Sequence, residues 1–461
     1  MNTTCNKKQL YILLLATTLS SFLTPFMGSA VNVALPAMAG ELSMTALTLS
    51  WVASSFILAA AITLVPLGRL ADIYGRKRMF LYGSIIFTLS TFLCTWSPTP
   101  FFLIFVRAIQ GIGGAMIFST GTAMLIAAYP PHERGKILGI NIAAVYIGLT
   151  IGPFIGGLLT EHLGWRYIFL LTALLGIIVS LLVAFMIEQE WLGAEGEGFD
   201  IAGSVLYAVA LFAIMYGFSL LPDWQAGLLI GFGVLGLVFF VVQQLKNPFP
   251  LLDIRLFLDN KVFAFSNLAA LINYCATFAV TFLLSLYLQH IKMMTPSQTG
   301  IILLAEPLMQ ALVSPIAGRL SDRFEPQIIS SIGMALNVMG LIPLIFINSD
   351  TSIHYIVLSL IVLGIGFALF SSPNVNAIMS SVDNKFYGVA SATLSTMRLT
   401  GQMFSMGITM LVFSIILGDH SISAANKLLL LKSTEVIFVI LAIICSGGIF
   451  ASLARGKVHN N

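Results

Sequence analysis

The sequence predicts an all-α membrane protein with 14 transmembrane helices: two six-helix bundles related by pseudo-two-fold symmetry plus two inserted central helices. The first observation is composition, since 58% of the 461 residues are hydrophobic, 9% are charged and the mean hydropathy is +0.97. A soluble chain of this length would need more charge to cover its surface. The second is the recurrence of apolar runs of about 20 residues, the length that crosses a bilayer. The third is a repeat of glycine and charged motifs between the two halves.

Fourteen apolar runs are separated by short polar connections, and we expect each to form one spanning helix. Lys7 and Lys8 precede the first run, as in a secretory signal. That run is longer than the apolar core of a signal peptide, so we interpret it as the first spanning helix. The expected spans are residues 10–35, 47–67, 79–97, 101–127, 138–160, 166–187, 200–221, 226–245, 262–288, 297–317, 328–348, 354–379, 389–417 and 433–453.

The two bundles are expected at residues 1–187 and 262–461. Duplication is indicated by Gly111, Gly135 and Gly148, each of which has a glycine counterpart 253 positions later. Two parallel repeats with a substrate site between them near the bilayer midplane are a known transporter architecture.

Residues 188–261 connect the bundles. They begin with an acidic segment, Glu188–Asp200, which we interpret as a solvated linker. Two apolar helices follow, and because their spans lack charged residues we expect them to pack on the lipid side and not to line a pathway. A polar connector, Lys246–Lys261, leads into the second bundle.

The distribution of Lys and Arg indicates the orientation in the membrane. If the N-terminus is cytoplasmic, the inward loops and tails carry sixteen Lys and Arg residues and the outward loops carry four. This asymmetry follows the positive-inside rule, so we expect both termini in the cytoplasm. The net charge of +3 reflects that topology and indicates no nucleic-acid partner.

A charged segment, Gly68–Arg78 (GRLADIYGRKR), lies between the second and third runs, and a shorter copy, Gly318–Pro326, lies 250 positions later. We predict a tight loop whose glycines permit close backbone approach. Asp72 is expected to accept hydrogen bonds from a helix N-terminus or to pair with an arginine across the bundle interface, holding one conformation. The alternative is that the basic residues only anchor the topology. The gating residues proposed here are Gly68, Arg69, Asp72, Gly75, Arg76, Gly318, Arg319 and Asp322.

The fourth run contains Arg107, with Gln110 one turn later on the same helix face. An arginine inside a span is costly and by default functional, the alternative being static pairing with backbone carbonyls.

Glycines recur every four residues in the fifth run, at Gly148, Gly152 and Gly156. Such a stripe lets a partner helix approach closely, and Pro153 favours a kink because it removes a backbone donor.

The chain resembles the major facilitator superfamily over nearly its whole length, and within it the fourteen-helix drug:proton antiporters. The resemblance implies alternating access driven by the proton gradient, export of hydrophobic or cationic compounds, and a monomer. The residues that carry it are Gly68, Asp72, Gly75 and Arg76; Arg107, Gln110, Gly111 and Gly113; Gly148, Gly152, Pro153, Gly156 and Gly157; and the segments Val31–Pro36, Trp51–Phe56 and Trp165–Phe169.

Met27 occupies the place where many proton-coupled relatives carry an aspartate, so another carboxylate performs the coupling or the protein is not proton-coupled. Glu306 is the acid placed deepest in a span, and Pro307 after it favours a bend that opens backbone groups to a cavity. A buried carboxyl group can exchange protons near neutral pH and, when ionised, attracts a cation. The alternative is a structural ion pair with Arg398 or Arg107.

Asn374 and Asn376 follow Pro373, where a broken helix can line a cavity. With Glu306 and Arg398, they complete the candidate residues for proton coupling and substrate binding.

No phosphate-binding loop, nucleophile triad or metal-ligand spacing occurs in the sequence, which argues against an enzyme, an ATP-driven pump or a bound cofactor. We expect a secondary transporter in the inner (cytoplasmic) membrane that exports small molecules in exchange for protons, with lipids as its surroundings. One alternative is a metabolite exporter or facilitator without proton coupling, in which Glu306 and Arg398 only recognise substrate. Another is a membrane sensor that binds a ligand without moving it.

Overall fold

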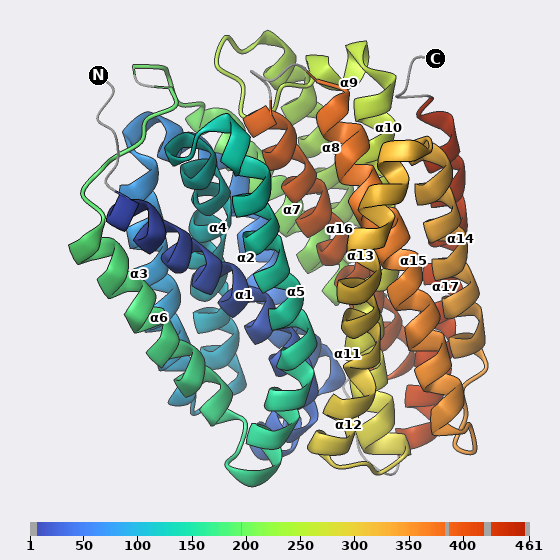
Figure 1. Ribbon diagram of the computed structural model, residues 1–461. Helices are drawn as coiled ribbons and strands as arrows, with labels where there is room; N and C mark the ends of the chain where they lie inside the picture. The colour runs from blue at the N-terminus through green and yellow to red at the C-terminus, as the bar shows by residue number, and fades with distance from the viewer. Residues whose placement is uncertain (1–6, 195, 383–386, 419–425, 457–461) are drawn as a thin grey trace.

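The computed structural model describes residues 7–194, 196–382, 387–418 and 426–456. Within these residues, 14 helical spans are long and apolar enough to cross a membrane, which confirms the expected fold class. The first helix begins and the last helix ends at the same end of the molecule (Figure 1). We call this the terminal end and the opposite one the far end.

The helices follow each other along the chain with short connections. The N-terminal half comprises α1 (Lys7–Leu42), α2 (Ala46–Tyr74), α3 (Arg76–Thr95), α4 (Pro100–Ala128), α5 (Pro131–His162) and α6 (Arg166–Met186). The inserted region comprises α7 (Ile201–Leu220), α8 (Trp224–Lys246) and the short α9 (Arg255–Asp259). The C-terminal half comprises α10 (Lys261–Thr277), α11 (Ala279–Leu286), the π-helical turn η1 (Tyr287–Ile291), α12 (Pro296–Leu303), α13 (Ala305–Arg323), α14 (Pro326–Ile345), α15 (Ile353–Ser380), α16 (Tyr387–Ile416) and α17 (Lys427–Ala454). One span is formed by α10, α11 and η1 together, and another by α12 and α13.

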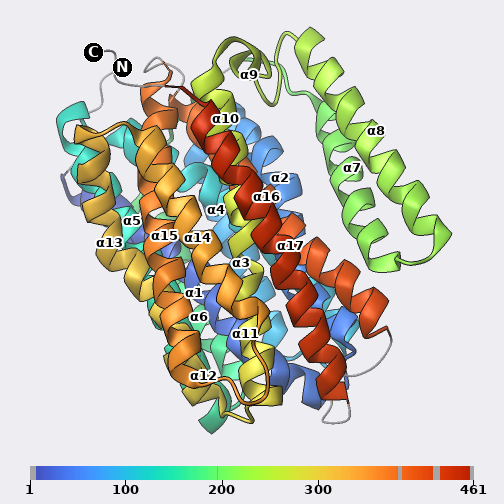
Figure 2. The ribbon, with the colours of Figure 1, turned by 90° about the vertical axis from the view of Figure 1, so that its right-hand side faces the viewer.

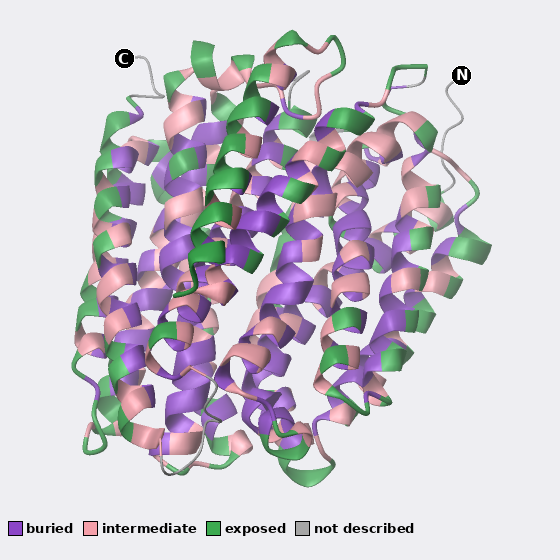
Figure 3. Cartoon of the chain, turned by 180° about the vertical axis from the view of Figure 1, so that it is seen from behind, coloured by how far each residue is buried: buried purple, intermediate pink, exposed green. Residues whose placement is uncertain are grey.

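Burial separates the two faces of most helices. Figure 3 shows buried residues on the inner faces and exposed ones on the outside of the bundle. Many of the exposed side chains are large and apolar, including Phe101, Phe185 and Phe450. An outer surface of this kind is suited to lipid and not to water.

The same glycine contacts occur in both halves. A Cβ on Gly148 of α5 would lie 2.5 Å from the carbonyl oxygen of Phe22 in α1, and one on Gly401 of α16 would lie 2.4 Å from that of Leu271 in α10. Small residues permit such close helix approach. The glycine repeat seen in the sequence therefore corresponds to a repeat of helix packing.

The charged segment Gly68–Arg78 is mostly helical, which corrects the predicted loop. α2 continues through it to Tyr74, and Gly75 alone separates α2 from α3 in this described segment. The second charged segment, Gly318–Pro326, is also mostly helical, since α13 continues to Arg323 and α14 begins at Pro326. Leu, Ala and Arg are good helix formers, so α2 extends beyond the apolar run and ends only before Gly75.

The inserted helices lie at one side of the molecule (Figure 2). α7 packs on α2 and α16, and therefore contacts both halves, whereas α8 packs on α7. Tyr216 of α7 stands beside Trp51 of α2, with ring centroids 6.5 Å apart. On the other side, a Cβ on Gly407 of α16 would lie 2.6 Å from the ring of Phe218 in α7.

The two halves are in close contact at the far end. A Cβ on Gly157 of α5 would lie 2.4 Å from the carbonyl oxygen of Pro296, the first residue of α12. Nearby, Gln289 of η1 donates to the carbonyl oxygen of Val33 in α1 at 2.9 Å. These contacts join the halves on the side away from the chain ends.

Candidate functional site

A cavity of about 210 Å³ lies between the two halves. Residues from α1, α2, α4 and α5 line it on one side, and residues from α10 to α13, α15 and α16 on the other. Within the described chain, α7 and α8 contribute no lining residue. The aromatic lining residues are Phe56, Phe118, Tyr274, Phe278 and Phe367. The other polar or charged lining residues are Thr24, Ser29, Asn32, Arg107, Thr277, Thr281, Glu306, Gln310, Ser395, Arg398 and Gln402.

Glu306 is the only acid among the described residues that line this cavity. It lies in the first turn of α13, just after the interruption between α12 and α13, and the following Pro307 has no N–H to donate. Gln310 donates to the Oε1 of Glu306 at 3.2 Å, while the buried Oε2 has no hydrogen-bond partner among the described residues. No ion pair joins Glu306 to Arg398 or Arg107 in the part of the chain described here.

Arg398 of α16 also lines the cavity and is half-buried. Its guanidinium carbon lies 5.1 Å from the ring centroid of Tyr274, a distance typical of a cation–π contact. Among the described residues, no oxygen accepts a hydrogen bond from this guanidinium. Its N–H groups therefore have no hydrogen-bond acceptor in the part of the chain that the structure describes.

Arg107 is buried at the wall of the cavity and is tied to its neighbours. Its Nε donates to the carbonyl oxygen of Val52 at 3.2 Å, and its Nη1 donates to Gln110 at 2.5 Å. The guanidinium also stands 4.7 Å from the centroid of the Phe56 ring. Gly111 keeps α4 close to α2, because a Cβ there would lie 2.3 Å from the Phe56 carbonyl oxygen. The residue thus pairs with a backbone carbonyl and faces the cavity as well.

The structure does not bring Asn374 and Asn376 into the cavity, contrary to the prediction. Asn374 is buried, accepts from Arg455 Nη1 at 2.9 Å and donates to the carbonyl oxygen of Ser266 at 3.1 Å. The Asn376 side chain donates to the hydroxyl oxygen of Ser321 in α13 at 3.1 Å. The expected break after Pro373 is absent from α15, which is continuous, since neighbouring helices can accommodate a proline inside a span.

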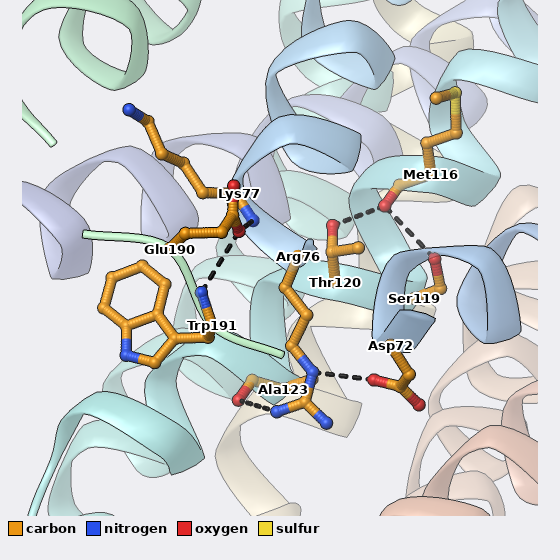
Figure 4. A network of polar contacts seen from close by, with 9 residues as sticks. All are labelled: Asp72, Arg76, Lys77, Met116, Ser119, Thr120, Ala123, Glu190 and Trp191. Carbon is orange, nitrogen blue, oxygen red and sulfur yellow. Dashed lines mark hydrogen bonds and ion pairs between the residues drawn. The ribbon is translucent and has the colours of Figure 1, made fainter. Parts of the chain in front are cut away.

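Asp72 pairs with an arginine of its own half, which corrects the predicted pair across the bundle interface. Arg76 Nε lies 2.7 Å from Asp72 Oδ1, and Arg76 Nη1 donates to the carbonyl oxygen of Ala123 in α4 at 3.3 Å (Figure 4). Arg76 is only four residues further along the chain, so the pair with Asp72 forms within one half.

The acidic segment Glu188–Asp200 packs on the junction between α2 and α3. It is therefore more than the solvated linker that we expected. The Glu190 carboxylate accepts the backbone N–H of Lys77 at 2.7 Å (Figure 4). It also accepts the backbone N–H of Arg78 at 3.2 Å. These residues begin α3, where free N–H groups and the helix dipole favour a negative charge.

Gly75 makes this docking possible. Its φ of +123° is a conformation that residues with a side chain rarely adopt, and a Cβ would lie 2.6 Å from the Glu190 carboxyl carbon. Further along the linker, Glu197 forms an ion pair with Arg69 at 2.5 Å. Glu195, also counted in the acidic segment, lies outside the described residues.

Among the described residues, no acidic linker docks on the second charged segment as Glu188–Asp200 does on the first. Gly318 packs near α15, where its Cβ would lie 3.2 Å from the Ser372 hydroxyl. Arg319 and Asp322 are exposed, and neither has a hydrogen bond or ion pair with the described residues.

The glycines of α5 serve two contacts. Gly152 and Gly156 continue the close packing on α1 that Gly148 begins, whereas Gly157 faces the first residue of α12 in the other half. Pro153, within α5, lines the cavity.

A family model described as Major Facilitator Superfamily matches residues 17–406, and a further match covers residues 266–458. The chain belongs to the major facilitator superfamily. The riboflavin transporter RibZ of Clostridioides difficile is 30% identical over 394 residues, 85% of each chain. The multidrug resistance protein Stp of Mycobacterium tuberculosis is 31% identical over 409 residues, 87% of this chain and 75% of that protein. A solved bacterial homologue of the human lysosomal transporter Spinster, inward-facing and unoccupied, has a TM-score of 0.72 at 16% identity, covering 97% of this chain and 98% of that one.

The expected resemblance is therefore confirmed, and the protein is a secondary transporter of the major facilitator superfamily, a family of transporters and not of enzymes. Met27 occupies the position in α1 where the resemblance led us to expect an aspartate. Its side chain is buried and does not line the cavity.

Sequence reasoning missed two residues of this transporter that the structure brings forward. Tyr274 stands under Arg398 at the cavity wall, but nothing in the sequence distinguishes it from other tyrosines in apolar runs. Glu190 caps α3, and the available signal was that its acidic segment was expected on the same side of the membrane as the basic segment Gly68–Arg78.

Proposed function

We propose that this protein exports small hydrophobic or cationic molecules by alternating access, in exchange for protons. The terminal end would face the cytoplasm of a cell bounded by an inner (cytoplasmic) membrane, in keeping with the positive-inside distribution. Support for the substrate class comes from relatives named as drug resistance proteins and from the aromatic lining of the cavity.

The observation that carries the proposal is the unpartnered carboxylate oxygen of Glu306 in the cavity between the halves. An ionised carboxylate in such a place is costly unless a positive or donating group compensates it. Either a proton or the substrate supplies this group. Because both use the same oxygen, binding of one displaces the other, which is the requirement for exchange.

Alternating access requires the halves to separate at the far end and to approach at the terminal end. The contacts between α5 and α12 and between η1 and α1 are then the ones that break. The glycine stripe of α5 is filled by α1 of the same chain, which favours a monomer as the working unit.

The test uses purified protein in liposomes with an imposed pH gradient and the cationic dye rhodamine 123. We expect the parent to move dye against its gradient and the Glu306→Gln variant to bind dye without gradient-driven transport. Glu435→Gln is the matched control, because Glu435 is an exposed acid of α17 away from the cavity. Equal gradient-driven transport by the parent and Glu306→Gln would refute the role of this carboxylate.

A second candidate is export or facilitated passage of a metabolite without proton coupling. Met27 in place of an acid and the 30% identity to a riboflavin transporter favour it. In this case the parent would equilibrate substrate equally well with and without the pH gradient.

A further inference from the structure

We propose that Arg398 binds an anionic or strongly hydrogen-bond-accepting group of the substrate, so that aromatic acids and zwitterions are preferred over simple lipophilic cations. This inference rests on the proposed function, because it concerns the same cavity. It replaces the broad expectation of hydrophobic or cationic compounds with a defined arrangement of charges.

Arg398 differs from the two buried arginines of the described chain in having no acceptor. Arg107 donates to Val52 and Gln110, and Arg455 at the end of α17 donates to Asn374. Among the described residues, Arg398 has the face of Tyr274 and the nearby Tyr146 of α5, and otherwise the cavity beside it. An arginine in a span without an acceptor is unfavourable, and a planar guanidinium suits a carboxylate with two parallel N–H groups.

Glu306 supplies the complementary group at the same cavity. Its Oε2 is buried and accepts no hydrogen bond from any described residue. Among the charged groups that line the cavity, the described residues thus leave one donor group and one acceptor without a partner. Aromatic rings such as those of Phe278 and Phe367 also line the cavity. A flat aromatic molecule that carries both an acceptor and an N–H or O–H donor satisfies both.

A simple lipophilic cation fits this arrangement less well. It compensates Glu306 but leaves the N–H groups of Arg398 without an acceptor, and its charge repels the guanidinium. A zwitterion compensates both residues, and its donor can still take the place of the proton on Glu306. Proton exchange and selectivity for an acceptor are thus compatible.

Two dyes isolate the effect, because rhodamine 123 is the methyl ester of rhodamine 110. Rhodamine 110 has a free carboxylate and is a zwitterion at neutral pH, whereas the ester is a cation of nearly the same size, and both carry amino groups that donate. Fluorescence anisotropy with purified protein measures the affinity for each dye. We expect the parent to bind rhodamine 110 on the order of tenfold more tightly, the value of one charge-assisted hydrogen bond.

Arg398→Gln is expected to remove this preference by weakening rhodamine 110 binding while rhodamine 123 binding persists, which also shows that the variant is folded. Arg398→Lys should retain part of the preference, and it decides the question if the glutamine variant does not fold. Arg323→Gln is the control, because Arg323 is exposed at the end of α13, does not line the cavity and is not one of the gating residues.

The proposal is overturned if the parent binds rhodamine 123 as tightly as rhodamine 110, if it binds neither dye, or if the preference survives in Arg398→Gln. If the parent binds neither dye, the proposed function is in question as well. In the other two cases, gradient-driven transport of rhodamine 123 that depends on Glu306 would leave the proposed function standing. The two proposals therefore fail by different measurements.

Discussion

Ionisable side chains inside the helix bundle fall into two groups, according to which groups compensate their charge. Arg107 and Arg455 donate to oxygens of the protein, so their charges are compensated whether or not a ligand is present. Glu306 and Arg398 line the cavity with a carboxylate oxygen and a guanidinium that have no partner among the described residues. Uncompensated groups of opposite sign in one cavity are what a binding site requires and a static core avoids.

Asp200 allows a prediction about pH, because its carboxylate is held by several donors just before α7. Burial acts to raise the pKa of Asp200, but the N–H of Gly203 and the amides of Gln244 and Gln243 donate to the carboxylate, and the pKa is lowered overall. A lowered pKa adds stability that is complete above the unfolded value of about 3.9 and is lost as the pH falls through the folded value.

We therefore expect Asp200→Asn to reduce stability by about 1 kcal/mol at pH 6 to 7, and the difference from the parent to shrink as the pH falls below about 4. Thermal unfolding in detergent across this pH range measures it. Asp223→Asn is the matched control, since Asp223 precedes α8 and its side chain makes no capping hydrogen bond. A deficit in Asp200→Asn that stays constant with pH would contradict the assignment.

At the scale of elements, the two charged segments share a sequence pattern but differ in their surroundings. The one between α2 and α3 receives the linker, whose N–H groups at Gly193 and Ala194 both donate to the carbonyl oxygen of Asp72 at 2.9 Å. The one between α13 and α14 leaves Arg319 and Asp322 exposed. The linker that follows α6 therefore braces the terminal end of the N-terminal half alone.

Glu190→Gln tests this brace. Loss of the negative charge at the N-terminus of α3 is expected to cost about 1 kcal/mol and to speed amide hydrogen exchange at Lys77 and Arg78. Hydrogen exchange followed by mass spectrometry measures the local effect. Glu188→Gln provides the comparison, because Glu188 is exposed and belongs to the same linker. Unchanged exchange at α3 in Glu190→Gln would mean that the linker does not hold this helix.

For the whole molecule, the features that could be predicted from the sequence are those that a bilayer requires of any chain crossing it. Each crossing needs a long apolar helix, so hydropathy predicted the number and order of spans, and the glycine repeat predicted the packing of both halves. The sequence also predicted that Glu306 lies at a cavity, because an ionisable residue inside a span is usually functional. Partners of polar side chains were not predictable, because they depend on helix rotation. Asn374 accordingly pairs with Arg455, and Asp72 with Arg76.

The repeat predicts positions but not chemistry. Phe56 and Glu306 are 250 residues apart, and each lets a glycine of the next-but-one span approach its carbonyl oxygen. A Cβ on Gly111 would lie 2.3 Å from the Phe56 oxygen, and one on Gly364 would lie 2.4 Å from the Glu306 oxygen. The aromatic ring in one half and the carboxylate in the other make the cavity asymmetric. Under the proposed function, we therefore expect the C-terminal half, which also carries Arg398, to contribute the unpartnered charged groups that select the substrate.

Closure at the far end gives a prediction for the molecule as a whole. Glu161 of α5 accepts the backbone N–H of Ser297 in α12 at 3.0 Å, so these positions are adjacent while the far end is closed. We introduce Glu161→Cys with Ser297→Cys after replacing the native cysteines by alanine, and we join them with a reducible bis-methanethiosulfonate. Gradient-driven dye transport in liposomes should stop on crosslinking and return on reduction, because the halves can no longer separate there.

The control joins two positions of one half. Glu41→Cys with Arg166→Cys links α1 to α6, whose side chains form an ion pair at the same end of the molecule. If the halves move as rigid units, this crosslink leaves transport unchanged while the pair across the halves blocks it. Full transport with Glu161 and Ser297 positions quantitatively crosslinked would show that substrate leaves without separation of α5 and α12, and alternating access by rocking of the two halves would have to be abandoned.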